Sequence, residues 1–410
     1  MAFHVMDEAN RCLECKKPQC QKGCPINTPI PEVIRLLKEH KLDEAGWLLF
    51  ENNPLTTVCS LICNHENQCE GHCVLGRKGT PVHFSLIENY ISTTYATKMV
   101  KGPHPSNGMK VAIVGSGPAG ITIAILMARY GYQVTIFESK EHIGGMLRYG
   151  IPDFRLPKSV LDDIQYRHLE LKGIKIRPNT RIGEAIGVDE LFRDGYKAIF
   201  IGTGVWKPNT LKIKGETLGN VHYAINYLAN PNCYKLGERV AVIGAGNAAM
   251  DVARTAIRNG ARYVTCYSRT QKIAAREHEA SYAKLEGVAF EYHLKPVEFV
   301  DEGVVFRAVE EQEDGSLVEI PGSDRLHESD SVIICISQGP QNAIVNTTTG
   351  LEANERGLLI ADDCGRTSRP GVFASGDVVK GSRTVVEAVA YSKKVAEAMH
   401  DYIQSQLEGE

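Results

Sequence analysis

A short apolar strand, a glycine-rich turn and a helix follow one another twice in this chain. The first copy runs through Val111–Val114, Gly115-Ser-Gly-Pro-Ala-Gly120, a helical stretch to Tyr130 and a second strand at Val134–Phe137. The second copy runs through Val240–Ile243, Gly244-Ala-Gly-Asn-Ala-Ala249, a helix to about Arg258 and a strand at Tyr263–Tyr267. Further strands are predicted at Ala198–Ile201, Ser331–Ile336 and Val372–Ala374, and a C-terminal helix at Thr384–His400. The pattern predicts an α/β fold with two Rossmann-like, doubly wound parallel sheets.

The first glycine turn predicts a dinucleotide site because of its context. Glycines in a turn can mean only a turn, but here the turn follows a strand and opens a helix. Backbone amides at the helix N-terminus then face a pyrophosphate, and the missing side chains let it approach. We expect contacts from Gly115, Gly117, Pro118, Ala119 and Gly120. Glu138, at the end of the second strand, is expected to accept hydrogen bonds from ribose hydroxyls.

The second turn predicts a site for a nicotinamide dinucleotide. We expect contacts from Gly244, Gly246, Asn247 and Ala248. Its second strand ends in Ser268-Arg269 rather than in an acid, and Arg276 follows. A guanidinium suits the 2′-phosphate of NADPH, which this pattern favours, with NADH possible. The alternative is that both arginines are solvated surface residues.

The chain has two nucleotide sites, and only the second carries arginines suited to NADPH. The first site is therefore expected to bind a different dinucleotide, and FAD is the candidate. Ser375-Gly376-Asp377, after a strand and before a helix, could place a carboxylate near a ribityl chain. Flavin-dependent disulfide reductases carry two cysteines near the flavin, but Gly144–Pro152 contains no thiol. A flavin here must therefore send its electrons elsewhere.

Eight of the twelve cysteines lie before residue 74, in two groups of four. The groups are Cys12-x2-Cys15-x4-Cys20-x3-Cys24-Pro25 and Cys59-x3-Cys63-x5-Cys69-x3-Cys73. Dense thiols in a cytosolic protein indicate metal binding, and the first group is of the bacterial ferredoxin type. Structural zinc is the alternative. Iron-sulfur clusters are favoured because a redox-silent metal would leave the flavin without an outlet.

Composition excludes other classes of function. A formal net charge of −3 provides no basic field for nucleic acid, and no apolar run is long enough to span a membrane. Asp7 and Glu8 stand where a signal peptide would be apolar, so a cytoplasmic protein is expected. Turn-forming residues at Lys101–Gly108 predict a linker, and helical spacing at 31–39 and 43–50 predicts a helical N-terminal domain. The expected domains are 1–105 for iron-sulfur clusters, 106–217 and 336–410 for FAD, and 218–335 for NAD(P)H.

These motifs resemble the small (beta) subunit of bacterial NADPH-dependent glutamate synthase and the N-terminal half of dihydropyrimidine dehydrogenase. The most specific string is Tyr149-Gly-Ile-Pro-Asp-Phe-Arg-Leu-Pro157. The resemblance implies FAD, NADPH and two [4Fe-4S] clusters. It implies one cluster on Cys12, Cys15, Cys20 and Cys73, and another on Cys24, Cys63 and Cys69 with Glu88. Cys59 remains a competing fourth ligand, since thiolate is the better iron ligand. Further cofactor contacts are expected from Gly145, Met146, Leu147, Ile151, Arg155, Gly204, Gly376, Asp377 and Thr384.

The resulting hypothesis is a subunit that takes hydride from NADPH onto FAD and passes electrons through the clusters to a catalytic or electron-accepting partner. The best match is a glutamate synthase small subunit. The alternatives are the electron-input subunit of an NAD(P)H-dependent dihydropyrimidine dehydrogenase and an NAD(P)H:ferredoxin-type oxidoreductase. No amino-acid side chain is expected to act as a catalytic group.

Overall fold

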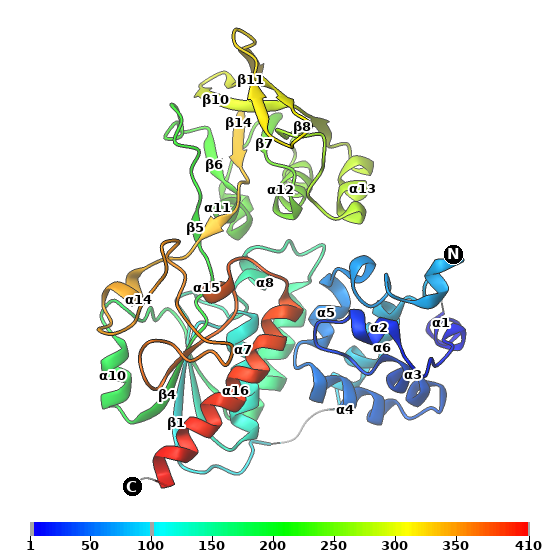
Figure 1. The fold of residues 1–410 in the computed structure, drawn as a ribbon, viewed down its shortest axis with the longest axis vertical. Coiled ribbons are helices and arrows are strands. Elements are labelled where there is room, and N and C mark those ends of the chain that lie inside the picture. The colour runs from blue at the N-terminus through cyan, green and yellow to red at the C-terminus, as the bar shows by residue number, and fades with distance from the viewer. Residues whose placement is uncertain (1–3, 99–101, 409–410) are drawn as a thin grey trace. The chain divides into compact units, whose positions relative to one another are not determined.

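The computed structural model describes residues 4–98 and 102–408, which form two compact units (Figure 1). Unit 1 contains Met1–Arg148, Asp153–Val205 and Pro340–Glu410, and unit 2 contains Tyr149–Pro152 and Trp206–Gly339. The chain thus passes between units beside a short antiparallel pair, β5 (Lys207–Pro208) and β15 (Gln338–Gly339). The domain boundaries expected from the sequence were 217/218 and 335/336. Lys101 of the expected linker lies outside the described residues, and Gly102–Asn107 has no regular structure.

All regular elements of the N-terminal domain within residues 4–98 are helices, as its spacing predicts. Its elements are α1 (Val5–Arg11), α2 (Gln19–Gly23), α3 (Ile30–Lys38), α4 (Leu42–Asn52), α5 (Thr56–Ile62) and α6 (Phe84–Ala96), with the short 3-10 turns η1 (His65–Asn67) and η2 (Val74–Arg77). Helix α3 buries Ile30, Val33, Ile34 and Leu37, which recur at i, i+3, i+4 and i+7. Their core also contains Cys69, with Cys12, Cys20 and Cys73 packed against it. The thiols are therefore part of the core.

The first parallel sheet has the strand order β16-β4-β1-β2-β3. Its strands are β1 (Lys110–Val114), β2 (Gln133–Phe137), β3 (Lys175–Arg177), β4 (Tyr196–Ile201) and β16 (Val372–Ala374). Helices α7 (Pro118–Arg129) and α16 (Val385–Glu408) lie along one side, and α10 (Val188–Arg193) and α14 (Ala343–Asn346) on the other (Figure 1). The strand order reverses at β1, because β2 and β4 flank it. Ligands of such sheets bind at the carboxyl ends of the strands at this reversal.

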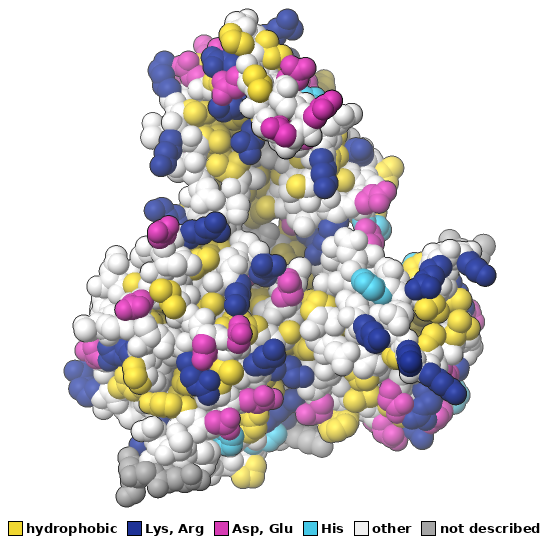
Figure 2. Space-filling model, viewed as in Figure 1, with side chains coloured by type: hydrophobic (Ala, Val, Ile, Leu, Met, Phe, Trp, Pro, Cys, Tyr) yellow, Lys and Arg dark blue, Asp and Glu magenta, His cyan; other side chains and the backbone are white. Residues whose placement is uncertain are grey.

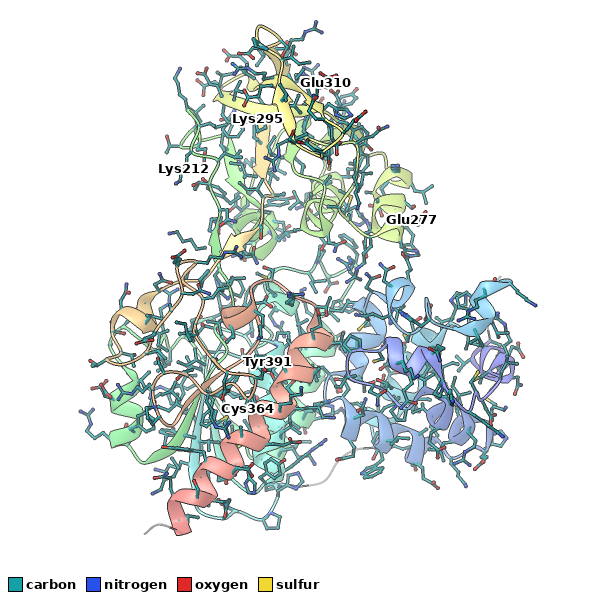
Figure 3. All side chains as sticks on the ribbon, in the orientation of Figure 1. Lys212, Glu277, Lys295, Glu310, Cys364 and Tyr391 are labelled. Atoms are coloured by element: carbon teal, nitrogen blue, oxygen red, sulfur yellow. The ribbon has the colours of Figure 1, made fainter. Side chains whose placement is uncertain are left out.

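The rest of unit 1 connects these layers. The connections contain α8 (Met146–Tyr149), α9 (Lys158–Asp163), η3 (Ile164–Leu169, a π-helix), η4 (Glu170–Lys172) and α15 (Asp377–Lys380). Tyr391 on α16 donates its hydroxyl to the Asp362 carbonyl at 2.6 Å and so fixes the loop of Cys364 (Figure 3). Within the unit, Lys393 of α16 donates to the Asn52 carbonyl at the end of α4 at 2.9 Å. The helical domain is thereby tied to the first sheet.

Unit 2 repeats the arrangement of the first sheet in the order β6-β14-β7-β8-β9. Its parallel strands are β6 (Val221–Tyr223), β7 (Arg239–Ile243), β8 (Tyr263–Tyr267), β9 (Ala289–Glu291) and β14 (Ser331–Ile334), and its helices are α11 (Ala224–Ala229), η5 (Pro231–Cys233), α12 (Asn247–Arg258) and α13 (Glu277–Leu285). Strand β7 takes the place of β1, between β8 and β14. The predicted fold class is confirmed.

An antiparallel sheet in unit 2 was not predicted. It consists of β10 (Leu294–Val300), β11 (Gly303–Glu311), β12 (Leu317–Glu319) and β13 (Arg325–Glu328). Phe299, Val304 and Phe306 bury one face of it against Ile334 and Ile243 of the parallel sheet. Among residues 4–98 and 102–408, we find no helix whose length and hydropathy suit it to crossing a membrane.

Candidate cofactor sites

The first glycine turn follows β1 at the carboxyl edge of the sheet, where the strand order reverses. Gly115 has φ +96°, and a Cβ on it would lie 2.7 Å from the Gly202 carbonyl oxygen at the end of β4. A Cβ on Gly120 would lie 1.9 Å from the Gly115 carbonyl oxygen. In front of Gly117, by contrast, nothing lies within 4 Å. The turn is closed on its protein side and open where a pyrophosphate would approach.

Glu138 holds this turn from the end of β2. Its carboxylate accepts hydrogen bonds from the backbone N–H and the hydroxyl of Ser116, and from the backbone N–H of Lys140 at 2.8 Å. The side chain is buried, with 5% exposed. The Ser139 hydroxyl also donates to this carboxylate, at 3.2 Å, so its roughly four lone-pair sites are all used, and a ribose hydroxyl would have to displace one of these local donors. The position of Glu138 at the end of β2 agrees with the role predicted for it, which stays a prediction.

The Ser375–Asp377 turn lies against the N-terminus of α7. A Cβ on Gly376 would be 3.1 Å from that of Ala119, next to Pro118 at the start of the helix. The structure therefore brings two motifs far apart in sequence to one edge of the sheet. The loop of Gly145 lies there too, because a Cβ on Gly145 would be 2.9 Å from the Gly117 Cα. Met146 and the fully buried Leu147 continue from it into α8.

The remaining residues expected near FAD lie in several different segments of the chain. Gly204 follows β4, two residues beyond the carbonyl that packs on Gly115. Thr384 precedes α16, and its hydroxyl donates to Glu387 at 2.6 Å while its N–H donates to the same carboxylate oxygen at 3.0 Å. This is a helix-capping arrangement, which the sequence analysis did not consider for Thr384. Arg155 belongs to unit 1, whereas Ile151 belongs to unit 2.

Burial raises the pKa of Asp377 to about 6, from an ordinary value of 3.8. Between these values the folded chain retains a proton that the unfolded chain has lost, so stability falls as pH rises through this window. The shift corresponds to about 3 kcal/mol. We expect the unfolding free energy of the FAD-free Asp377→Asn variant, relative to wild type, to increase by about this amount between pH 3.5 and 7. Denaturant titrations at both pH values measure it, and parallel pH profiles would contradict it.

The second glycine turn repeats the first. Gly244 has φ +128°, and a Cβ on it would lie 2.6 Å from the Cys335 carbonyl oxygen after β14. Nothing lies within 4 Å in front of Gly246, and Asn247 and Ala248 begin α12. Ala249, in place of the third glycine, is fully buried, in agreement with a packing role.

The two arginines expected at the 2′-phosphate differ in how firmly they are placed. Arg276 is half-buried, and its backbone N–H donates to the Asn247 side-chain oxygen at 3.0 Å. The preceding Ala275 N–H donates to the Ala245 carbonyl at 2.9 Å. The loop of Arg276 is therefore fixed beside the glycine turn. Arg269 is exposed, just beyond β8.

Arg254 contributes to this site indirectly, and sequence reasoning missed it. It is 6% exposed on α12 and forms ion pairs with Glu279 on α13 at 2.9 Å and with Glu286, the C-cap of α13, at 3.0 Å. Arg276 is the N-cap of α13, so this network holds the helix that begins at Arg276. Helix α12 also contains Asp251 and Arg258, so nothing in the sequence singled out Arg254.

The first cysteine set lines a cavity in the helical domain. The cavity is bounded by Cys12, Cys15, Cys20, Cys69 and Cys73, together with the apolar side chains of Ile30, Ile34, Val82 and Phe84. The Cys20 thiol interacts electrostatically with Cys73, Cys12 and Cys15, and its burial raises its pKa to about 11. The structure thus brings Cys73 of the second sequence group to the first. Thiols around an apolar cavity fit a cluster bound by thiolates.

The second set is formed by residues of both groups as well. The Cys69 thiol interacts electrostatically with Glu88 and Cys24, and the Cys63 thiol with Cys59, Glu88 and Cys69. Burial is the largest cause of the raised pKa of Cys69, and the contact with Cys59 is the largest for Cys63. Among the described residues, no three His, Cys, Asp or Glu side chains surround a single-ion site. A four-iron cluster holds its ligands farther apart than one ion does.

Glu88 and Cys59 both lie at the second set, so the structure leaves both as candidate ligands. Glu88 is 6% exposed and accepts a hydrogen bond from the Thr56 hydroxyl at 2.6 Å. Burial raises its pKa to about 7, and the nearby Glu70 adds to this increase while the hydrogen bond from Thr56 opposes it. Cys59 is 2% exposed.

Substitution distinguishes these two ligands. We expect Glu88→Ala to change the electron paramagnetic resonance signal of one cluster and to lower the stability of that cluster, whereas Cys59→Ser leaves iron content and spectrum unchanged. The reason is that serine nearly preserves the volume of a thiol that does not bind iron, whereas alanine has no atom that could bind iron in place of the carboxylate. Iron analysis and the spectrum of the reduced protein provide the measurement. The reverse pattern would assign the position to Cys59.

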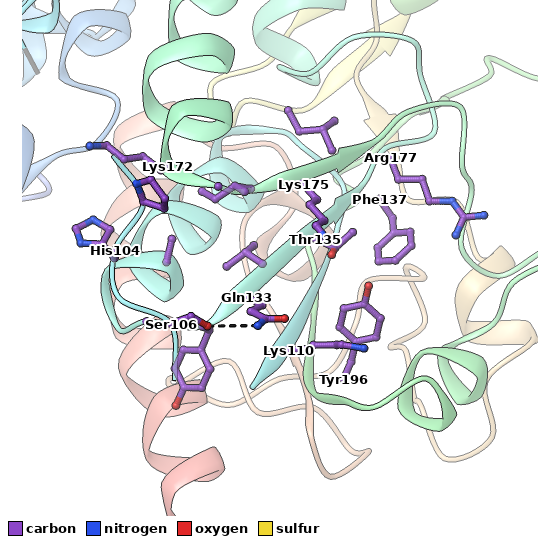
Figure 4. Close-up of a pocket in the computed structure, with 18 residues that line it drawn as sticks. His104, Ser106, Lys110, Gln133, Thr135, Phe137, Lys172, Lys175, Arg177 and Tyr196 are labelled. Carbon is purple, nitrogen blue, oxygen red and sulfur yellow. Dashed lines mark hydrogen bonds between the residues drawn. The ribbon is translucent and has the colours of Figure 1, made fainter. Parts of the chain in front are cut away.

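A separate cavity of about 630 Å³ runs along β1, β2 and β3 (Figure 4). It extends from Lys110 and Gln133 at strand starts to Phe137 and Arg177 at strand ends. Its lining also contains Lys172 and Lys175, so cationic side chains are spread along it (Figure 4). None of the predicted cofactor residues lines it.

Comparison with known proteins agrees with this division of the chain. Residues 109–392 match the family model described as pyridine nucleotide-disulphide oxidoreductase. Residues 2–100 match that of dihydropyrimidine dehydrogenase domain II, 4Fe-4S cluster. The chain is 34% identical to the small chain of NADPH glutamate synthase from Halomonas elongata, over 97% of this chain and 90% of that one. The chain belongs to the glutamate synthase small-chain family.

One further relative and one solved structure are also similar to this chain. The NAD-dependent dihydropyrimidine dehydrogenase subunit PreT of Salmonella typhimurium is 30% identical over 98% of this chain and 94% of its own length. The NADPH complex of FprA from Mycobacterium tuberculosis has a TM-score of 0.63 at 18% identity, over 75% of this chain and 86% of that one. This last likeness shows the fold alone.

Membership of this family makes the chain an oxidoreductase that uses FAD, NADPH and 4Fe-4S chemistry. The zinc alternative is thereby set aside. The predicted family, fold class and kinds of cofactor are confirmed. The residue assignments stay predictions, as does the number of clusters.

Proposed function

We propose that this chain is the electron-input subunit of a glutamate synthase type of enzyme. It oxidises NADPH in unit 2 and delivers electrons from FAD, through two [4Fe-4S] clusters, to a partner subunit. The observation that carries this proposal is that the thiol-lined helical domain and the first glycine turn belong to one compact unit. Lys393 and Arg129 attach the end of α4 to the two helices of the first sheet, α16 and α7.

The protein contributes position and electrostatics. When bound, FAD accepts two electrons as hydride and releases them singly, which is what iron-sulfur clusters require. Gly117 and Gly246 leave space for pyrophosphates at helix N-termini, and Glu138 is fixed at the end of β2, beside the first of these turns. Asp377 places a buried carboxyl at the same edge as the first turn. No thiol lies in Gly144–Pro152 to divert the electrons.

The preference for NADPH is proposed to rest on Arg276 and Arg269. A hydrogen bond to a charged group contributes about 1.5–3 kcal/mol, or roughly 10–100-fold. We expect Arg276→Ala to raise the KM for NADPH by about that factor while leaving the KM for NADH nearly unchanged. Arg269→Ala should act in the same direction, but less strongly because the residue is exposed.

Steady-state reduction of a dye with each coenzyme measures this preference. Lys272→Ala, in the same exposed loop, is the matched control. If Arg276→Ala raises the KM for NADPH and the KM for NADH by the same factor, the residue stabilises the loop rather than binding the 2′-phosphate.

The partner is identified by anaerobic purification from the source cell followed by mass spectrometry. A large amidotransferase subunit supports the proposed function. A pyrimidine-reducing subunit would transfer the assignment to the dihydropyrimidine dehydrogenase group, whose similar subunit PreT is described as NAD-dependent. Recovery of the chain alone, with its flavin and iron intact, would favour a free ferredoxin-type reductase.

A further inference from the structure

We propose that the electron acceptor docks on the face around the first cysteine loop, and that the acceptor presents an acidic surface there. The proposal rests on the proposed function in one respect, namely that electrons leave through the N-terminal domain. It adds where they leave and which chemistry recognises the acceptor.

The first cysteine loop is where the thiol-lined cavity meets the surface. Leu13 lines the cavity between Cys12 and Cys15 and is nevertheless 62% exposed. The next residue, Glu14, has φ +47°, a left-handed conformation that is uncommon outside glycine. This tight turn presents an apolar side chain to solvent directly beside two candidate ligands. An acceptor bound at Leu13 would lie close to the cavity. This closeness favours electron transfer, because the rate of electron tunnelling falls steeply with distance.

Five cations flank this opening. Lys16 and Lys17 lie between lining residues Cys15 and Pro18, Lys22 follows Cys20, and Arg77 and Lys78 follow the lining residue Leu75. All five are exposed, and none has a salt-bridge partner among residues 4–98 and 102–408. The two loops are joined because Arg11 donates to the backbone carbonyls of Thr80 and Pro81. The cations therefore surround one opening from both sides.

Two carboxylates in or beside the first cysteine loop are already paired with cations. Glu14 pairs with Lys38 at 2.5 Å, and the buried Glu8 pairs with Arg11 at 2.8 Å. Figure 2 shows Lys and Arg side chains beside hydrophobic atoms on the visible face of the N-terminal domain. Since the whole chain has a formal net charge of −3, this positive face is a local feature.

A positive rim around one exposed apolar residue favours an acidic protein over other occupants. Complementary charge steers two proteins together and raises association rates by roughly 10–1000-fold at low salt. We therefore assign this face to a charge-guided encounter with an acidic one-electron acceptor.

The test compares two small iron proteins of opposite charge as acceptors, an acidic rubredoxin and a basic c-type cytochrome. Each takes one electron as its Fe(III) becomes Fe(II), so one NADPH reduces two molecules of either. The full chain, with its cofactors, is reduced anaerobically with dithionite, freed of excess reductant and mixed with each acceptor in a stopped-flow instrument. Because dithionite replaces NADPH as the reductant, this measurement does not depend on the NADPH reaction of the proposed function. That reaction is tested separately by steady-state reduction of a dye with NADPH.

Charge reversal gives the deciding comparison. The two test variants are Lys16→Glu with Lys17→Glu, and Arg77→Glu with Lys78→Glu, the latter outside the predicted cysteine motif. The matched control is Lys212→Glu with Lys235→Glu, two exposed lysines of unit 2, of which Lys212 is labelled in Figure 3. Each pair changes the charge by the same amount. Iron and sulfide analysis confirms that the clusters are retained.

We expect both test variants to slow rubredoxin reduction by at least about 10-fold at low salt, with the difference disappearing at high salt. Cytochrome reduction should be unchanged or faster, and the control should behave as wild type. The proposal is overturned if rubredoxin rates are unchanged in the second variant with clusters intact, or if the control slows them equally. It is also overturned if wild-type rates with rubredoxin do not fall as salt increases.

Discussion

Replacing Cys73 with serine is expected to stop electron delivery to a protein acceptor while NADPH still reduces the flavin. Cys73 lies in the second cysteine group of the sequence, but the structure places it with Cys12, Cys15 and Cys20. Loss of even an outer partner of a metal site costs roughly 10–100-fold, so loss of a ligand should exceed this. The flavin turn is formed by other residues and should be unaffected.

Two readouts on the same sample separate these effects. Bleaching of the flavin band by NADPH should proceed at the wild-type rate, while iron content falls and reduction of a protein acceptor decreases. Cys233→Ser is the matched control, since Cys233 is exposed and lies in unit 2, far from either group in sequence. Full iron content in the Cys73→Ser protein would show that the predicted ligand set is wrong.

A methyl group at Gly120 is expected to abolish FAD binding and to destabilise the first sheet. The added Cβ would lie 1.9 Å from the Gly115 carbonyl oxygen, far below the van der Waals contact distance. Because this oxygen is a backbone atom, no side-chain rotation can relieve the clash. Overpacking of this kind costs typically 1–3 kcal/mol and can exceed that where the backbone cannot move. Gly117→Ala should behave differently, because its Cβ would meet no protein atom within 4 Å.

The pair distinguishes folding from cofactor recognition. We expect Gly117→Ala to keep the unfolding midpoint of the FAD-free chain and to lose FAD affinity, since its methyl group would occupy the space left for the pyrophosphate. Gly120→Ala should lower the unfolding midpoint and lose FAD affinity as well. Gly219→Ala, which also meets nothing within 4 Å, is the control. Equal FAD affinity in Gly117→Ala and wild type would contradict the placement of the pyrophosphate.

Both predictions concern residues that the sequence already indicated, because local chemistry dictated them. The strands at 263–267 and 372–374 were predicted with the bounds that the structure has. Apolar runs of that length followed by glycine turns have few other ways to bury their side chains and satisfy their backbone. The turns at Gly115 and Gly244 follow from positive φ and close approach, which only glycine tolerates.

The antiparallel sheet of residues 294–328 was not predicted, for a physical reason. Strand β11 alternates irregularly, since its buried residues include the adjacent pair Gly303 and Val304 and it pairs with three other strands. A β-bulge shifts its register against β10 between Pro296 and Glu298. The two-residue turn between β10 and β11 is Asp301-Glu302, which lacks the Asn-Gly or Asp-Gly pair typical of such turns, so neither regular periodicity nor a turn signature marked this sheet in the sequence.

Which distant residues meet was decided by the tertiary structure. The sequence by itself determined two glycine turns on parallel strands and eight thiols in two groups, because both depend on short spacings. Only folding of the helices brings Cys73 beside Cys20, Glu88 beside Cys69, and Gly376 against Ala119. Such pairs are separated by tens or hundreds of residues, and their contact depends on the packing of whole helices and sheets rather than on any local pattern.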